Sequence, residues 1–147
     1  MLTIRKRITP EDVTALAKIE KICFPFGERW SSAVLADEVA AHDTWVAAVD
    51  GEIAGFLLAD ERSKYGYIST VDVLPDYRGR GIATRLMRVA EREYRKRGFR
   101  EMRLEVHVDN PAQMLYFRLG YRAISVRKHY YKLNSHALSM VKSLLAR

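Results

Sequence analysis

The stretch "LPDYRGRGIATRLM", Leu74–Met87, places two glycines and two arginines directly ahead of an amphipathic run. From Ile82 onward, apolar residues recur at the spacing of one helical face, so we expect a helix to begin there. The first turn of a helix leaves up to four backbone N–H groups without partners inside the helix, and the aligned peptide dipoles add partial positive charge. Such a helix start favours an anion.

The residues ahead of this helix are suited to a phosphate group. Gly79 and Gly81 carry no side chain that would block close approach to the backbone. The backbone N–H groups of residues 79–83 could surround a pyrophosphate, with Arg78 or Arg80 adding positive charge. The alternative is a glycine-rich turn that only joins a strand to a helix.

Two better-known phosphate motifs fit this stretch poorly. A P-loop ends in G-K-[ST], whereas Ile82 and Ala83 follow Gly81 here. A dinucleotide fingerprint G-x-G-x-x-G would need Gly or Ala where Thr84 stands, and it normally follows the first strand of a parallel unit. The stretch instead lies in the middle of the chain, after a predicted hairpin.

The composition indicates one domain over residues 1–147, with 48% hydrophobic residues and therefore enough apolar surface for a core. No apolar run approaches the ~18 residues of a membrane span, and the first residues are charged where a signal peptide would be apolar. The single cysteine, Cys23, fits a reducing compartment and is expected to be a buried free thiol. We therefore expect a soluble, cytoplasmic protein without a membrane partner.

The chain carries 25 Lys and Arg against 18 Asp and Glu, a formal charge of +7 that favours anionic partners without choosing among them. A basic nucleic-acid-binding module is therefore one alternative, although no zinc-finger spacing or RNP-type aromatic motif is present. The four histidines have no metal-ligand spacing with one another or with Cys23, so no metal is predicted.

Turn, cap and periodicity signals predict an α/β order of elements with a mostly antiparallel start. The strongest short signal is the Asp50-Gly51 turn of a hairpin. Strands are expected at residues 2–8, 44–49, 52–59, 67–73, 102–108, 121–131 and 137–144. Helices are expected at residues 10–23, 32–41, 82–97 and 111–119. The last segment, 137–144, could instead be helical.

Two motifs of the chain resemble those of a known protein family. Arg78-x-x-Gly81-x-Ala83 resembles the [Q/R]-x-x-G-x-[G/A] motif of the GCN5-related N-acetyltransferases (GNAT), and "LYFRLGY", Leu115–Tyr121, is similar to their L-Y-x-x-x-G-[FY]. The resemblance covers nearly the whole chain. It implies a single domain with a central mixed, mostly antiparallel sheet of about seven strands, flanked by about four helices.

The same resemblance implies acetyl-CoA as cosubstrate, bound with its pyrophosphate on the helix start and its pantetheine arm along the preceding strand. The residues implied in cofactor binding are Val71, Val73, Arg78, Gly79, Arg80, Gly81, Ile82, Ala83, Asn110 and Tyr116.

Within the family, three stretches resemble protein N-terminal acetyltransferases of the RimI and Ard1 type. "CFPF" resembles their substrate loop, in which Phe24 and Pro25 would pack on the first residue of the peptide. "RKHYYK" resembles their paired tyrosines, Tyr130 and Tyr131, on the other side of the peptide groove. "LEV" resembles the strand whose glutamate, Glu105 here, serves as base. The alternatives are ordinary core packing, a strand pair of tyrosines and a solvated charge.

The chain departs from these relatives at two places. Asn134, Ser135 and His136 stand before Ala137, where an acidic residue is usual, which leaves the peptide preference open. Asp72 lies in a strand position that is often small or apolar. It would bind an amine if it faced the substrate and would have no role if it faced solvent.

The chemistry requires a neutral amine that attacks the thioester directly in a ternary complex. Glu105, through a water, is the expected base, and Tyr67 on the preceding strand is the second candidate. Backbone N–H groups near Val71 and Val73 would polarise the thioester oxygen, and Tyr116 would protonate the departing thiolate.

The expected acceptor is a protein or peptide N-terminus, with ribosomal proteins among the candidates. The nearest alternative is an acetyltransferase for a small amine or a lysine side chain. Nucleic acid is not the expected substrate, and we expect a monomer or weak homodimer.

Overall fold

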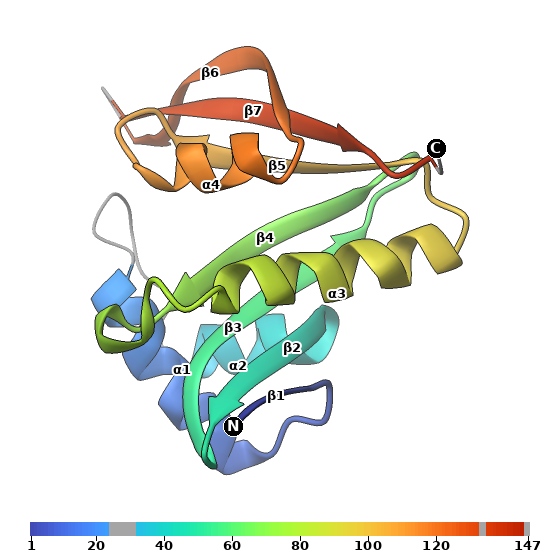
Figure 1. Cartoon of the computed structure of the whole chain (residues 1–147). Helices are drawn as coiled ribbons and strands as arrows, with labels where there is room; N and C mark the ends of the chain where they lie inside the picture. Colours follow the sequence, from blue (N-terminus) through green and yellow to red (C-terminus); the bar gives the residue numbers. More distant parts are fainter. Residues whose placement is uncertain (24–31, 133–134, 146–147) are drawn as a thin grey trace.

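The computed structural model of the chain describes residues 1–23, 32–132 and 135–145 (Figure 1). The described residues form a seven-stranded sheet of order β1-β2-β3-β4-β5-β7-β6 and four α-helices, which confirms the predicted α/β class. In chain order the elements are β1 (Leu2–Arg5), α1 (Pro10–Cys23), α2 (Ser32–Ala41), β2 (Asp43–Val49), β3 (Glu52–Glu61), β4 (Gly66–Val73), the 3-10 turn η1 (Pro75–Tyr77), α3 (Ile82–Lys96), β5 (Glu101–His107), α4 (Ala112–Arg118), β6 (Arg122–Lys132) and β7 (Ser135–Ser143).

Local sequence signals set most element ends. The β2–β3 hairpin turns at Asp50 and Gly51, whose φ angles of 52° and 87° are the left-handed values that such a turn requires. Helix α1 begins with a reciprocal cap, because the Asp12 N–H donates to Thr9 Oγ1 and the Thr9 N–H donates to an Asp12 carboxylate oxygen. Residues 135–143 form the strand β7, so the helical alternative for the C-terminal segment is wrong.

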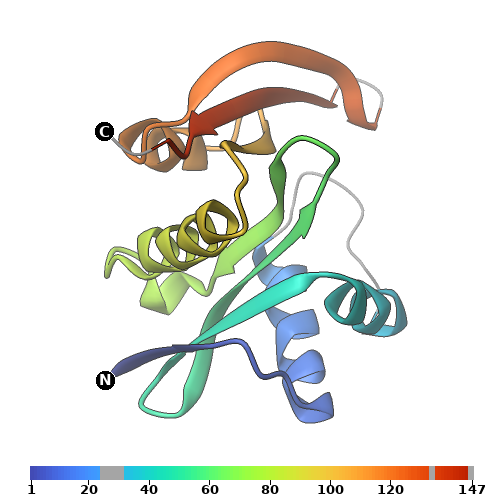
Figure 2. The ribbon, with the colours of Figure 1, turned by 90° about the vertical axis from the view of Figure 1, so that its right-hand side faces the viewer.

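Helices cover both faces of the sheet (Figure 2). The amphipathic helix α3 packs on one face, where its buried Leu86 meets a large apolar cluster that includes Leu57 of β3. On the other face, Leu16 of α1 and Leu35 of α2 pack against Phe56. Alternate residues of β3 therefore point into two cores, as the period-2 geometry of a strand requires.

The sheet opens between β4 and β5, which are its one parallel pair. Their pairing runs only from Gly66–Met102 to Ile68–Leu104, although β4 continues to Val73. The strand β5 turns instead to β7, with which it pairs along its whole length. Figure 1 shows β4 and β5 meeting at one end and diverging toward the start of α3. One edge of β4 is thus left without a strand partner.

Two features of β4 accompany this divergence. Leu58 pairs with Thr70 while Ala59 pairs with Ile68, so Ser69 is an extra residue that bulges and adds local twist. Farther along, Gly55 of β3 lies so close to β4 that an added Cβ would sit 2.5 Å from the Asp72 carbonyl oxygen. A glycine at position 55 thus allows β3 to hold the open end of β4.

We predict that Gly55→Ala lowers the free energy of unfolding by about 2 kcal/mol, because the new methyl group meets backbone that cannot move aside. The measurement is urea unfolding. Gly51→Asn is the matched control, since nothing lies within 4 Å of a Cβ there and Asn tolerates the left-handed turn. A loss below about 0.5 kcal/mol in Gly55→Ala would contradict the close approach.

Candidate active site

The start of α3 has the open backbone that the sequence predicts. Gly79 and Gly81 have φ angles of 79° and 78°, and Gly81 is the N-cap of the helix. Among the described residues, no atom lies within 4 Å of a Cβ built on either glycine. Glycine is therefore needed here for its left-handed backbone, and any added side chain would extend into the space in front of the helix.

That space is a cavity of about 760 Å³ bounded by the open edge of β4, the start of α3 and the start of α4. Its lining includes nine of the ten residues that the sequence assigns to the cofactor: Val71, Val73, Arg78, Gly79, Gly81, Ile82, Ala83, Asn110 and Tyr116. Other lining residues are Ile22, Cys23, Asp72, Tyr77, Thr84, Pro111, Ala112, Leu115 and Arg118.

Arg80 is the exception among the predicted cofactor residues. Its guanidinium stacks on the Tyr77 ring, 5.2 Å from the ring centroid, and donates to the Asp76 carbonyl oxygen at 3.3 Å. Arg80 lines a separate hollow together with Asp50 and Glu52. The structure therefore directs the Arg80 side chain away from the cavity that the other nine residues line.

Two hydrogen bonds position the Arg78 side chain at the cavity. Its Nε donates to the Val73 carbonyl oxygen at 2.9 Å, and one terminal nitrogen donates to Cys23 Sγ at 3.5 Å. Burial raises the pKa of the Cys23 thiol, so Cys23 stays protonated at neutral pH. Its role in this arrangement is to anchor the Arg78 side chain.

The open edge of β4 directs backbone groups toward the cavity. The Leu74 N–H donates to the Ala54 carbonyl oxygen at 2.8 Å, so Leu74 faces β3. Peptide groups alternate in direction along an antiparallel strand. Val71 and Val73, at odd distances from Leu74, therefore direct their N–H groups to the edge without a strand partner.

The side chain of Asp72 is buried and does not face solvent, although the residue is part of the cavity lining. It lies beside the equally buried Glu20 of α1. Burial, and then the contact with Glu20, raise the pKa of Asp72. Glu20 was missed by the sequence analysis, although its spacing of four from Leu16 puts it on the buried face of α1.

A second polar group lies where β4 and β5 still pair. The Tyr67 hydroxyl of β4 donates to Glu105 Oε1, and it also shares a hydrogen bond of 3.1 Å with the Tyr130 hydroxyl. The Ser139 hydroxyl donates to Glu105 Oε2 at 2.9 Å. The predicted residues Tyr67, Glu105 and Tyr130, from β4, β5 and β6, are thus brought together in one hydrogen-bonded group.

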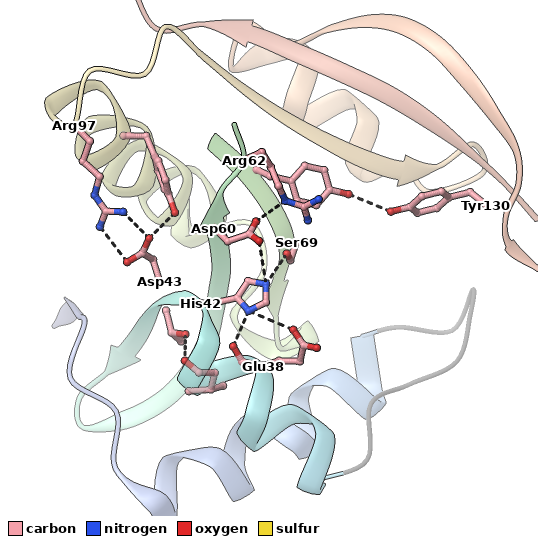
Figure 3. A network of polar contacts seen from close by, with 12 residues as sticks. Glu38, His42, Asp43, Asp60, Arg62, Ser69, Arg97 and Tyr130 are labelled. Carbon is pink, nitrogen blue, oxygen red and sulfur yellow. Dashed lines mark hydrogen bonds and ion pairs between the residues drawn. The ribbon is translucent and has the colours of Figure 1, made fainter. Parts of the chain in front are cut away.

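Cations flank this group. Arg127 places one terminal nitrogen 3.9 Å from Glu105 Oε1 and lies over the Tyr130 ring, 4.8 Å from its centroid. Arg62 lies over the Tyr67 ring at 4.2 Å and pairs with Asp60 (Figure 3). Burial, followed by the hydrogen bond to Glu105, raises the pKa of Tyr67, which therefore stays a neutral hydroxyl at physiological pH.

Ser139 was not found from the sequence. It lies on β7 directly opposite Glu105 in the antiparallel register, and its side chain is buried. Only the pairing of two segments more than thirty residues apart reveals this neighbour. The hydroxyl fixes one oxygen of Glu105 and leaves the other toward Tyr67.

Tyr116 lies in the cavity wall on α4, buried and in edge contact with Tyr121 at a centroid distance of 6.1 Å. Asn110 holds the start of α4, because its side-chain oxygen accepts a hydrogen bond from the Ala112 N–H at 2.9 Å. Phe24 and Pro25 and the side chain of Tyr131 lie outside the described residues.

His42 belongs to a polar network beside this site. Its Nδ1 contacts Glu38, and its Nε2 lies 3.2 Å from the Ser69 hydroxyl (Figure 3). Among the described residues, no three His, Cys, Asp or Glu side chains are placed to hold a metal ion. No helix in that part of the chain is long and apolar enough to cross a membrane.

Known proteins share this fold and this sequence pattern. A model of the Acetyltransferase (GNAT) family matches residues 13–121. The chain is 28% identical to an N-alpha-acetyltransferase of Sulfurisphaera tokodaii, over 90% of this chain and 88% of that protein. It is 30% identical to the N-alpha-acetyltransferase RimI of Mycobacterium tuberculosis, over 86% and 83% of the two chains. The crystal structure of the ribosomal-protein-S18-alanine N-acetyltransferase from Escherichia coli has a TM-score of 0.86 at 26% identity, over 100% and 96% of the two chains.

The chain belongs to the GNAT family of acetyltransferases. It is an acetyl-CoA-dependent N-acetyltransferase, and its relatives include N-alpha-acetyltransferases of the RimI type.

The two ends of α3 offer a matched test of the cavity. We predict that Gly81→Val raises the dissociation constant for CoA at least about tenfold, because the new side chain enters the space in front of the helix. Gly98→Val is the control: Gly98 follows the same helix with a φ of 97°, has nothing within 4 Å of a Cβ and does not line the cavity. Both variants carry similar backbone strain, so calorimetric titration separates strain from loss of the site. Equal CoA affinity in the two folded variants would contradict the assignment.

Proposed function

We propose that this enzyme transfers the acetyl group of acetyl-CoA to the α-amino group of a protein N-terminus. The observation that carries the proposal is that one strand, β4, contributes residues both to the cavity and to the polar group around Glu105. Val71 and Val73 of β4 line the cavity, and Tyr67 holds Glu105 four residues before Val71, about 13 Å along the strand. An acyl donor bound along this edge would end near a base.

The donor end would use the groups around the start of α3. The N–H groups of residues 79–83 and the Arg78 guanidinium would bind the pyrophosphate, as the partial positive charge of a helix N-terminus favours. The outward N–H groups of Val71 and Val73 would hold the pantetheine arm and polarise the thioester oxygen. Asn110, which fixes α4, would set the far wall of this channel.

Tyr116 would protonate the departing thiolate. It lies in the wall of the same cavity, so its hydroxyl is a candidate donor within the donor site. A positioned hydroxyl can donate a hydrogen bond to the sulfur as negative charge develops there and then supply the proton.

The acceptor must lose a proton before it attacks. An α-amino group has an ordinary pKa of about 7.7 to 8.0 and is roughly a tenth neutral at pH 7, whereas a lysine at about 10.4 is neutral only about once in a few thousand. Glu105 alone is a sufficient base for deprotonating an α-amino group and a weak one for deprotonating a lysine side chain. The buried acid-base group thus favours an N-terminal amine.

The side chains beside the base also favour a peptide. Arg62 and Arg127 each lie over one of the two hydrogen-bonded tyrosine rings. The tyrosine rings and guanidinium planes offer flat surfaces that suit a peptide backbone better than a flexible polyamine. Tyr130 and Tyr131, opposite Phe24 and Pro25, would form the walls of the peptide groove.

Ribosomal proteins are candidate acceptors. The Escherichia coli enzyme with the same fold is named for alanine of ribosomal protein S18. The proposal extends that class of acceptor to this chain, with a small or apolar first residue between the aromatic walls.

Replacing the base should abolish most catalysis without changing donor binding. We predict that Glu105→Gln lowers kcat by about 10²-fold or more, because the amide oxygen still accepts one of the two hydrogen bonds from Tyr67 and Ser139 but the side chain cannot take a proton. Steady-state kinetics and CoA titration are the measurements. Glu101→Gln, on the same strand and paired with Arg103, is the control. Wild-type turnover in Glu105→Gln would remove Glu105 from the mechanism.

The acceptor class is tested by direct competition. Equal concentrations of peptides with free N-termini, the same peptides with blocked N-termini and internal lysines, and spermidine are incubated with enzyme and acetyl-CoA. We expect the free N-termini to be acetylated at least about tenfold faster, since a larger fraction of their amine is neutral. Products are read by mass spectrometry. Faster acetylation of spermidine or of the blocked peptides would replace the proposal with a small-amine or lysine acetyltransferase.

A further inference from the structure

The hydroxyl of Tyr67 has only one hydrogen, and its position is set. A carboxylate only accepts hydrogen bonds, so that hydrogen is donated to Glu105 Oε1. The bond of 3.1 Å between Tyr67 and Tyr130 therefore needs Tyr130 as its donor. The three groups form a chain of hydrogen bonds in which Tyr130 donates to Tyr67 and Tyr67 donates to Glu105.

The two ends of this chain differ in access. The Glu105 side chain is only 9% exposed, whereas Tyr130 is 39% exposed. An amine on a peptide reaches the Tyr130 oxygen more easily than the carboxylate itself. Since the single hydrogen of Tyr130 is directed to Tyr67, its oxygen meets an approaching ammonium group as an acceptor.

We propose that Tyr130 is a catalytic residue that receives the proton of the acceptor amine and passes it through Tyr67 to Glu105. This inference rests on the proposed function only in needing an amine as acceptor. One N–H bond of the ammonium breaks as an O–H bond forms on Tyr130. The former Tyr130 hydrogen moves to Tyr67, and the former Tyr67 hydrogen moves to Glu105 Oε1. Each hydroxyl ends as it began, the amine is neutral and the carboxylate is protonated.

The surroundings fit a relay of neutral hydroxyls. Burial raises the pKa of Tyr67, so it bridges without becoming a phenolate. Arg127 stacks on the Tyr130 ring and keeps the ring against Tyr67, and Ser139 fixes the other oxygen of Glu105. Arg62, in the connection between β3 and β4, lies over the Tyr67 ring. The hydroxyl groups of Tyr130 and Tyr67 and the carboxylate of Glu105 are thus in position before the acceptor amine binds.

A relay and a simple peptide wall give different kinetics in Tyr130→Phe, which keeps the ring and removes the hydroxyl. We expect kcat to fall about tenfold or more while KM for the peptide stays within about threefold. Tyr67→Phe should show the same split. Because both changes break one chain, the double variant should be no slower than the slower single variant. Tyr65→Phe is the control, since Tyr65 lies two residues before Tyr67, in the connection between β3 and β4, and stacks on Arg103 instead.

Melting temperatures and CoA titration establish that each variant is folded. Tyr130→Phe with wild-type kcat, with or without a raised peptide KM, would overturn the relay. So would a double variant whose loss is the product of the two single losses, because the hydroxyls would then act independently. Failure of the proposed function is distinguishable, since wild-type enzyme would then leave free N-termini unmodified. In that case the same variants are measured with the amine that the wild-type enzyme does acetylate.

Discussion

After Ile68 and Leu104 the strands β4 and β5 no longer pair, and one edge of β4 continues without a strand partner. An unpaired backbone edge inside a sheet carries N–H and C=O groups that need other partners. One of them, the Val73 carbonyl oxygen, accepts hydrogen bonds from Arg78 and Cys23. The outward N–H groups of Val71 and Val73 face the cavity, and the same divergence provides the room for it. The position of the site is therefore a consequence of where this one parallel pairing ends.

The molecule separates two electrostatic tasks along that strand. At the α3 end, a helix start and Arg78 make the cavity attractive to an anion. At the other end, Glu105 lies between the hydroxyl groups of Tyr67 and Ser139 and beside Arg127, where under the proposed function it would take up the proton of the acceptor ammonium group. A donor bound at the first end and an acceptor held at the second would react without a covalent enzyme intermediate.

Features that depend on neighbouring residues were predictable from the sequence. The start of α3, the turn at Asp50-Gly51, the cap at Thr9 and the strand that carries Glu105 all follow from short-range patterns, and the structure has them. The family resemblance also selected nine residues that line one cavity.

Features that depend on register or helix packing were not predictable in this way. Ser139 meets Glu105 only because of the β5–β7 register, and Asp72 meets Glu20 only because α1 packs on β4. The Arg80 side chain points away from the cavity because its guanidinium stacks on Tyr77, and no local sequence pattern predicts this contact. The roles of Phe24, Pro25 and Tyr131 stay predictions from the sequence.

The most direct measurement is a crystal structure of this enzyme with CoA bound. We expect the pyrophosphate oxygens within hydrogen-bond distance, about 2.7 to 3.2 Å, of the backbone nitrogens of residues 79–83, with the pantetheine arm along Val71 and Val73. The thiol should end on the side of Tyr67 and Glu105. A pyrophosphate bound against Arg80, in the hollow beside Asp50 and Glu52, or an arm that leaves the edge of β4 empty, would contradict the dependence of the site on the opening between β4 and β5.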